Sequence, residues 1–180
     1  MKTVFSMLVF LVFLLETTPI QAQDSTLSRK YQIGLYNQFD LRNSSTNAIS
    51  VHRMLHDGFR KGLKPKLNDK LGNLTYGLFS FSTTYLTMLW SHEFGHKLRA
   101  AQVGGQFKIH NVALPFPYTT MHLPGDIGLV DESLTVTGGF EVNYLQVRAL
   151  QSDFVRQNGI YNADLSLAFA NRLMYPLYAS

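Results

Sequence analysis

The order of apolar and polar residues along the chain predicts a mainly helical domain. A helical stripe runs from Thr46 to Gly62 and stops before Pro65. A second helical pattern opens at Thr137–Asn143 and continues through apolar residues to Phe154. The polar segment from Gln23 to Ser45 precedes both and favours surface turns over a long helix.

The uncharged stretch Leu74–Trp90 predicts a buried helix. It is close to the length that crosses a bilayer, but its serine and threonine residues make it less apolar than a typical span. It can therefore be a helix of a soluble core or a membrane helix whose polar side faces other helices, and we prefer the second. The helix should continue to Gly104–Gly105, where a left-handed residue can end it.

Composition and the N-terminus indicate one exported domain. With 180 residues, of which 46% are hydrophobic and 16% charged, the chain can bury a single core. Lys2, an apolar run and a small residue at Ala22 predict a signal peptide over 1–22 and a mature domain over 23–180, with an uncleaved anchor as the alternative. The protein would then be membrane-associated, or secreted or periplasmic. The apolar tail Leu165–Tyr178 ends abruptly, which leaves a truncated C-terminus open.

The charge and the cysteine content of the chain limit which partners and which metal ligands are expected. The formal charge of +4 arises largely from basic residues between Arg53 and Lys70, which we interpret as a solvated face, with a contact to anionic lipid as the alternative. These residues do not alternate with aromatic ones, so a nucleic-acid partner is not expected. Because the chain contains 0 cysteines, any protein ligands to a metal should be histidine and carboxylate side chains.

One short motif, Ser91–His96, combines the residues that a zinc site needs. His92 and His96 are four residues apart, so on a helix both imidazoles leave the same face and can bind one metal ion. Glu93 is rotated away from that pair, which lets it act as a base toward a water molecule without becoming a ligand. The spacing therefore predicts two ligands to Zn²⁺ and a general base.

The motif resembles that of the zincin metallopeptidases. Gly95 inside the motif, Ala100 one turn later and Gly104 another turn on are similar to the motif helix of site-2 proteases, which is followed by a strand; Gly105–Val112 would be that strand. The resemblance implies a zinc peptidase. The metzincin branch is excluded, because Arg99 and Gln102 stand where that branch has Gly and a third His.

The third ligand has several candidates. Site-2 proteases use an Asp in a later Asp-Gly pair, and no such pair follows the motif. Glu141 is the preferred ligand, because it opens a helix after the close-packing pair Gly138–Gly139; the alternative is an acid that complements the helix dipole. The remaining candidates are weaker. They are the loop acids Asp126, Asp131 and Glu132, the further downstream acids Asp153 and Asp164, and the single histidines His110 and His122.

These features together predict a fold and a function. The fold is mainly α with a small α+β part, in which a zincin-like motif helix packs on a second, ligand-bearing helix and a short strand follows the motif. The function is hydrolysis of a protein or peptide substrate, with Glu93 as base and the run Ile109–Tyr118 as a possible edge strand for the substrate. Two alternatives remain: a soluble secreted zinc peptidase, and a non-catalytic membrane or binding protein that retains the motif.

Overall fold

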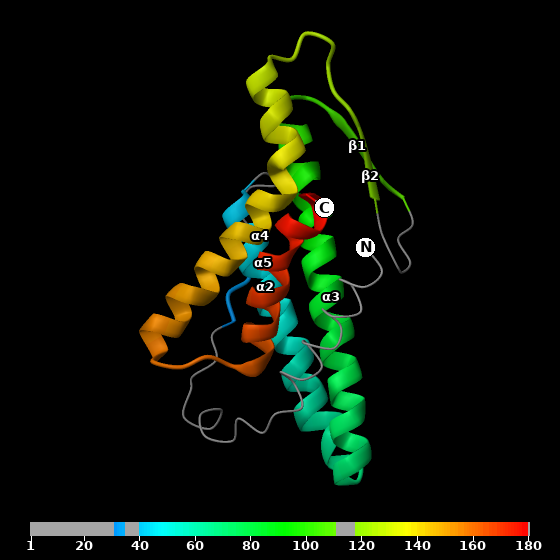
Figure 1. Ribbon diagram of the computed structural model, residues 1–180, viewed down its shortest axis with the longest axis vertical. Helices are drawn as coiled ribbons and strands as arrows, with labels where there is room; N and C mark the ends of the chain where they lie inside the picture. Colours follow the sequence, from blue (N-terminus) through cyan, green and yellow to red (C-terminus); the bar gives the residue numbers. More distant parts are fainter. Residues whose placement is uncertain (1–30, 35–39, 111–117, 180) are drawn as a thin grey trace.

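The structure is a mainly helical bundle with a small two-stranded sheet, as predicted (Figure 1). This computed structural model describes residues 31–34, 40–110 and 118–179; the predicted signal peptide and most of the predicted edge strand lie outside these ranges. The described helices and strands are α2 (Leu41–Gly58), α3 (Asp69–Gln102), β1 (Gln106–His110), β2 (Tyr118–His122), α4 (Leu129–Gln157) and α5 (Asn162–Ala179).

Helix α2 begins earlier than the sequence analysis predicts. Asp40 caps it, with its side chain accepting hydrogen bonds from the backbone N–H groups of Arg42 and Asn43 at 2.8 and 3.3 Å. The last residues of the polar N-terminal segment are therefore helical. At its other end α2 passes into a π-helical turn, Phe59–Leu63, and a 3-10 turn, Lys64–Lys66, instead of stopping at Gly62.

Helix α3 carries the motif and spans 34 residues, most of the length of the molecule in Figure 1. Asn68 caps its start by accepting a hydrogen bond from the Leu71 N–H at 2.9 Å. At its end Gly104 adopts a φ of 74°, and the Gly104 and Gly105 N–H groups donate to the Ala101 and Ala100 carbonyls. This Schellman arrangement confirms the predicted end of the helix.

The core forms where α2, α4 and α5 pack against α3. Its largest buried cluster takes Ile49 from α2, Leu150 from α4, Leu167 and Met174 from α5, and three residues of α3, which are Tyr85, Met88 and Leu89. Hydroxyl groups of α3 donate to carbonyls of the preceding turn, as Thr83 does to Phe79, which explains how a polar stretch stays helical. In the part of the chain that the structure describes, no helix is long and apolar enough to span a bilayer, so the preferred membrane interpretation of Leu74–Trp90 is not supported.

Strands β1 and β2 form an antiparallel hairpin beside the C-terminal end of α3 (Figure 1). Gln106 pairs with His122 and His110 pairs with Tyr118. A strand was predicted at Gly105–Val112, and β1 lies within that range. The hairpin matters for the site because it follows α3 and places Thr119 of β2 against Glu93 of the motif.

Helix α4 begins two turns before the predicted position. Asp131 and Glu132 belong to its first turn and are exposed, whereas the sequence analysis placed them in a loop. Glu141 consequently lies in the interior of α4 and not in its first turn. The pair Gly138–Gly139 also lies inside the helix, where it faces α3.

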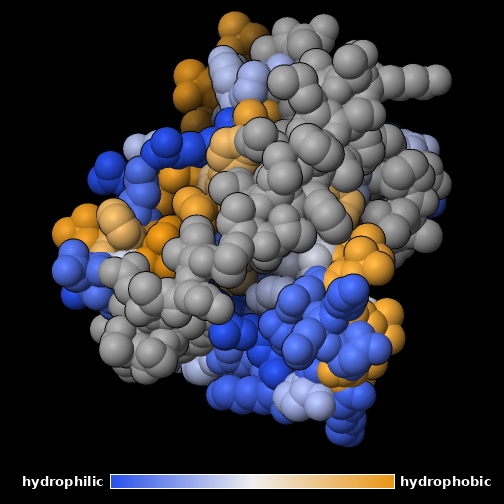
Figure 2. Space-filling view, turned by 60° about the horizontal axis from the view of Figure 1, so that its bottom comes forward, coloured by the Kyte–Doolittle hydropathy of each residue, from blue (hydrophilic) through white to orange (hydrophobic). Residues whose placement is uncertain are grey.

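The basic residues between Arg53 and Lys70 lie in two different environments. Lys61, Lys66 and Lys70 are exposed, and hydrophilic side chains gather at the end of the molecule that Figure 2 brings forward. Arg53 differs, because its side chain is buried and donates to Asp164 on α5 at 2.7 Å and to Asp153 on α4 at 2.9 Å. Grouping Arg53 with the solvated lysines was therefore wrong.

Candidate metal centre

The two motif histidines meet on one face of α3, as their spacing predicts. Their Nε2 atoms are 3.2 Å apart, and the ring planes are close to perpendicular at 83°. Two nitrogens bound to one tetrahedral zinc at about 2.0–2.1 Å lie about 3.3 Å apart. The separation of His92 and His96 thus suits a hydrogen bond between the two rings, and it also matches the separation of two ligands to a single ion.

The fold orients the ring of His96. Its Nδ1 lies 3.1 Å from the backbone carbonyl of Thr135 on α4. A carbonyl only accepts, so Nδ1 carries the hydrogen and donates it, which leaves a lone pair on Nε2. Metal-binding histidines are held in this way, by a hydrogen bond from the nitrogen that does not bind the metal.

Burial keeps His92 neutral. Its side chain is 1% exposed. Burial, and then the proximity of His96, lower the pKa of His92 to about 3, against the opposing effect of the Gly139 backbone. At neutral pH this imidazole is uncharged, which is the form that binds a metal.

Three glycines bring α3 and α4 into close contact at the motif. A Cβ atom at Gly95 would lie 2.2 Å from the carbonyl oxygen of Gly138, so neither helix can carry a side chain at this crossing. A Cβ atom at Gly139 would lie 2.6–2.7 Å from three ring atoms of His92. The imidazole of His92 therefore occupies the space that a side chain on α4 would otherwise fill.

Glu93 lies under the hairpin. Its side chain is 3% exposed, and the hydroxyl of Thr119 on β2 donates to its Oε2. A buried carboxylate needs such a donor. The sequence analysis did not single out Thr119, because the contact joins residues of two elements and leaves no local signal in the sequence.

The expectation that Glu141 faces the two histidines is not met. Its carboxylate accepts from Arg99 through both oxygens, at 2.7 and 2.9 Å, and is about one-third exposed. Arg99 lies two turns beyond His92 on α3, so it draws the Glu141 side chain toward the end of that helix. To bind a metal at the histidines, Glu141 would have to leave this ion pair; its ligand role stays a prediction.

The other candidate ligands also lie elsewhere. His110 contacts the Thr120 hydroxyl at 2.8 Å, and His122 is exposed at the other end of the hairpin. Asp153 and Asp164 pair with Arg53. Across residues 31–34, 40–110 and 118–179, no group of three or more His, Cys, Asp or Glu side chains is placed to hold a metal ion.

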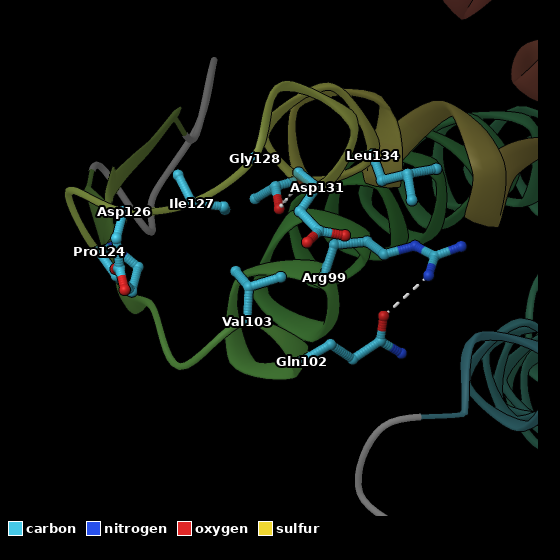
Figure 3. Close-up of a pocket in the computed structure, with 10 residues that line it drawn as sticks. Arg99, Gln102, Val103, Pro124, Asp126, Ile127, Gly128, Asp131 and Leu134 are labelled. Atoms are coloured by element: carbon cyan, nitrogen blue, oxygen red, sulfur yellow. Dashed lines mark hydrogen bonds between the residues drawn. The ribbon is translucent and has the colours of Figure 1, made fainter.

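A pocket of about 550 Å³ opens between the C-terminal end of α3 and the start of α4 (Figure 3). Thr135 contributes to its lining and is also the residue whose carbonyl holds His96. Arg99 and Gln102 line it from α3 and are joined by a hydrogen bond of 2.8 Å. Asp131 enters from the first turn of α4, and Asp126 lies on the segment before it. The pocket is polar and large enough for one or two amino-acid side chains.

A second histidine pair with the same spacing, His52 and His56 on α2, has a different environment. Both side chains are fully buried, with ring centroids 4.4 Å apart. His56 is within hydrogen-bond distance of the Tyr76 and Thr83 hydroxyls at 3.0 and 2.9 Å, and His52 of the Ala163 carbonyl at 3.1 Å. Both nitrogens of His56 are thus engaged within the protein, which marks this pair as part of the polar core.

Comparison of the chain with protein-family models, with curated proteins and with solved structures finds no significant match. The chemistry of the site must therefore be inferred from its own residues.

Proposed function

We propose that the protein is a zinc-dependent peptidase that hydrolyses a protein or peptide substrate, with His92 and His96 as metal ligands and Glu93 as general base. The 3.2 Å separation of the two Nε2 atoms carries this proposal. The hydrogen bond from His96 to Thr135 and the neutral state of His92 support it, because both make a nitrogen lone pair available.

The chain's own residues have distinct roles in this reaction. When bound, Zn²⁺ supplies Lewis acidity, which lowers the pKa of a coordinated water and polarises a carbonyl. Glu93 accepts the proton of the attacking water and passes it to the leaving amine. Thr119 holds the Glu93 carboxylate in place through its hydroxyl. The pocket between the C-terminal end of α3 and the start of α4 receives a substrate side chain next to the bond that is cleaved.

One observation favours the second candidate, a non-catalytic protein that binds zinc. Glu141 is engaged by Arg99, and among the described residues no third His, Cys, Asp or Glu side chain is placed to hold a metal ion together with the two histidines. A catalytic zinc site usually has three protein ligands, and a site with fewer binds the metal weakly. The experiment below separates the two candidates.

The test compares the parent with Glu93→Gln for zinc content and for cleavage of a peptide library. The amide preserves the shape of the side chain but cannot accept the proton, so we expect zinc to be retained and hydrolysis to fall by roughly 10²–10⁴-fold. Glu132→Gln, an exposed glutamate in the first turn of α4, is the matched control and should hydrolyse as the parent does.

Activity of Glu93→Gln within a few fold of the parent would contradict the assigned base. A parent that binds zinc but cleaves no member of the library would instead favour the non-catalytic candidate.

A further inference from the structure

The face of α4 that packs on α3 carries a buried asparagine, Asn143. Gly139, Asn143, Gln146 and Leu150 follow one another at helical spacing and form a single stripe. Gly139 faces the ring of His92, and Gln146 donates to the Ser91 hydroxyl at 2.7 Å. Asn143 lies between these two contacts, so it faces α3 at the level of the motif.

Asn143 is deeply buried and its amide is unpaired. The residue is 2% exposed, and neither Oδ1 nor Nδ2 has a hydrogen-bond partner among the residues that the structure describes. Buried side-chain amides are nearly always hydrogen-bonded, because burial without a partner destabilises the folded state. An unpaired amide at this position is available to bind a further group.

Helix geometry directs this amide toward the histidines. Side chains on an α-helix tilt toward its N-terminus and cover the residue four positions earlier. For Asn143 that residue is Gly139, whose missing side chain leaves the space that the ring of His92 occupies. Helix geometry therefore places Asn143 on the same face of α4 as Gly139, one turn further along, next to the contact with His92.

We infer that Asn143 Oδ1 is the third protein donor to the metal bound by His92 and His96, in the place that the sequence predicts for Glu141. This inference rests on the proposed function. An amide oxygen is an established ligand in calcium sites, and it brings no charge. With Asn143 as the third ligand, neither neighbouring carboxylate has to move: Glu141 stays paired with Arg99, and Glu93 stays hydrogen-bonded to Thr119.

A neutral donor has a measurable consequence. Two imidazoles and an amide leave the full double charge of the ion uncompensated, so a carboxylate at the same position should bind the metal more tightly. Asn143→Asp has nearly the same size and shape as the parent residue. A carboxylate that only supports His92 would also tighten binding, so the visible spectrum of the Co²⁺-loaded protein, which reports the donor atoms, separates a ligand from a supporting residue.

The experiment measures zinc affinity by competition with a chelator, together with the visible spectrum of the Co²⁺-loaded protein. We expect Asn143→Ala to weaken zinc binding by about tenfold or more, and Asn143→Asp to strengthen it by a similar factor. Both variants should change the Co²⁺ spectrum, which reports the donor atoms directly. Asn171→Ala is the matched control: Asn171 is a buried asparagine of α5 whose Oδ1 is also unpaired among the described residues, and its replacement should leave affinity and spectrum unchanged.

The outcomes distinguish this inference from the proposed function. A parent that binds zinc, with both Asn143 variants matching it in affinity and spectrum, would overturn the role of Asn143 and leave the peptidase proposal standing. A parent that binds neither zinc nor cobalt would overturn both. If Asn143→Ala does not fold, the near-isosteric Asn143→Asp decides alone, and an unchanged Co²⁺ spectrum in that variant rejects the inference.

Discussion

His92 and His96 are held in place by different means. Contact with Gly139 buries the ring of His92, whereas a hydrogen bond to the Thr135 carbonyl orients His96. Both constraints come from α4 and not from the motif helix. Although the motif is local in sequence, the arrangement of its side chains depends on a helix that begins more than thirty residues later.

The burial of His92 predicts a pH dependence of the metal-free protein. The pKa of His92 is lowered to about 3 in the folded state, against about 6.5 when unfolded, so unfolding takes up a proton between these values. Stability should fall as the pH drops below 6.5. Between about pH 6 and pH 5 the parent should lose about 1 kcal/mol more than His92→Gln, measured by chemical unfolding with a chelator present. Equal losses in the two proteins would contradict a buried, neutral His92.

The sequence predicts the placement of a side chain where that placement depends on spacing along one helix. It does not predict contacts between residues that are far apart in the chain. The shared face of His92 and His96 follows from their four-residue separation. The partner of Glu141 does not follow from any pattern, because Arg99 lies 42 positions away in the sequence. Asn143 was part of a predicted helix opening, but nothing in the sequence shows that its amide is buried without a partner.

At the scale of elements, the crossing of α3 and α4 determines the geometry of the site. The glycine pair before Glu141 was expected to allow close approach of two helices, and the structure shows that contact at Gly95 and Gly138–Gly139. It does so without bringing Glu141 to the histidines. The close contact serves His92, whose ring lies directly over Gly139.

Gly139→Ala should disturb the site more than the rest of the fold. The added Cβ atom would come within 2.7 Å of His92 ring atoms, so the ring must move. We expect a loss of about 1–3 kcal/mol in stability and weaker zinc binding, measured by thermal unfolding and by metal titration. Gly58→Ala is the control, because a Cβ atom there meets nothing within 4 Å. Unchanged zinc affinity in Gly139→Ala would show that this contact does not position His92.

Element boundaries were predictable where capping residues mark them. The end of α3 at Gly104 has the glycine that a left-handed C-terminus requires. The start of α4 has no such signal, because its N-cap residue is Gly128, which makes no side-chain hydrogen bond. This missing cap explains why Asp131 and Glu132 were placed in a loop.

At the scale of the whole molecule, one buried ion-pair cluster links three helices. Arg53 of α2 binds Asp164 of α5 and Asp153 of α4. Burial alone would lower the pKa of Arg53, but hydrogen bonds and charges of Asp164 and then Asp153 raise it. The guanidinium therefore stays charged in the core and depends on both carboxylates.

Asp164→Ala should destabilise the whole bundle. It removes the carboxylate nearest to the buried charge of Arg53 and leaves Asp153 beside that charge, and removal of one member of a buried pair typically costs about 3–5 kcal/mol. Asp153→Ala should cost less, since that carboxylate is 26% exposed. Asp126→Ala, at an exposed acid, serves as the control in denaturant unfolding. A loss for Asp164→Ala no larger than for Asp126→Ala would rule out this cluster as a major source of stability.

The central claim, a metal site at His92 and His96, is tested most directly by zinc titration of the purified parent and of the double variant His92→Ala/His96→Ala. The parent should bind about one zinc per chain, and the double variant should bind none at the same site. The double variant His110→Ala/His122→Ala, which removes the two hairpin histidines, should bind as the parent does. A parent without stoichiometric zinc, or a His92→Ala/His96→Ala variant that binds zinc as tightly as the parent, would contradict the account.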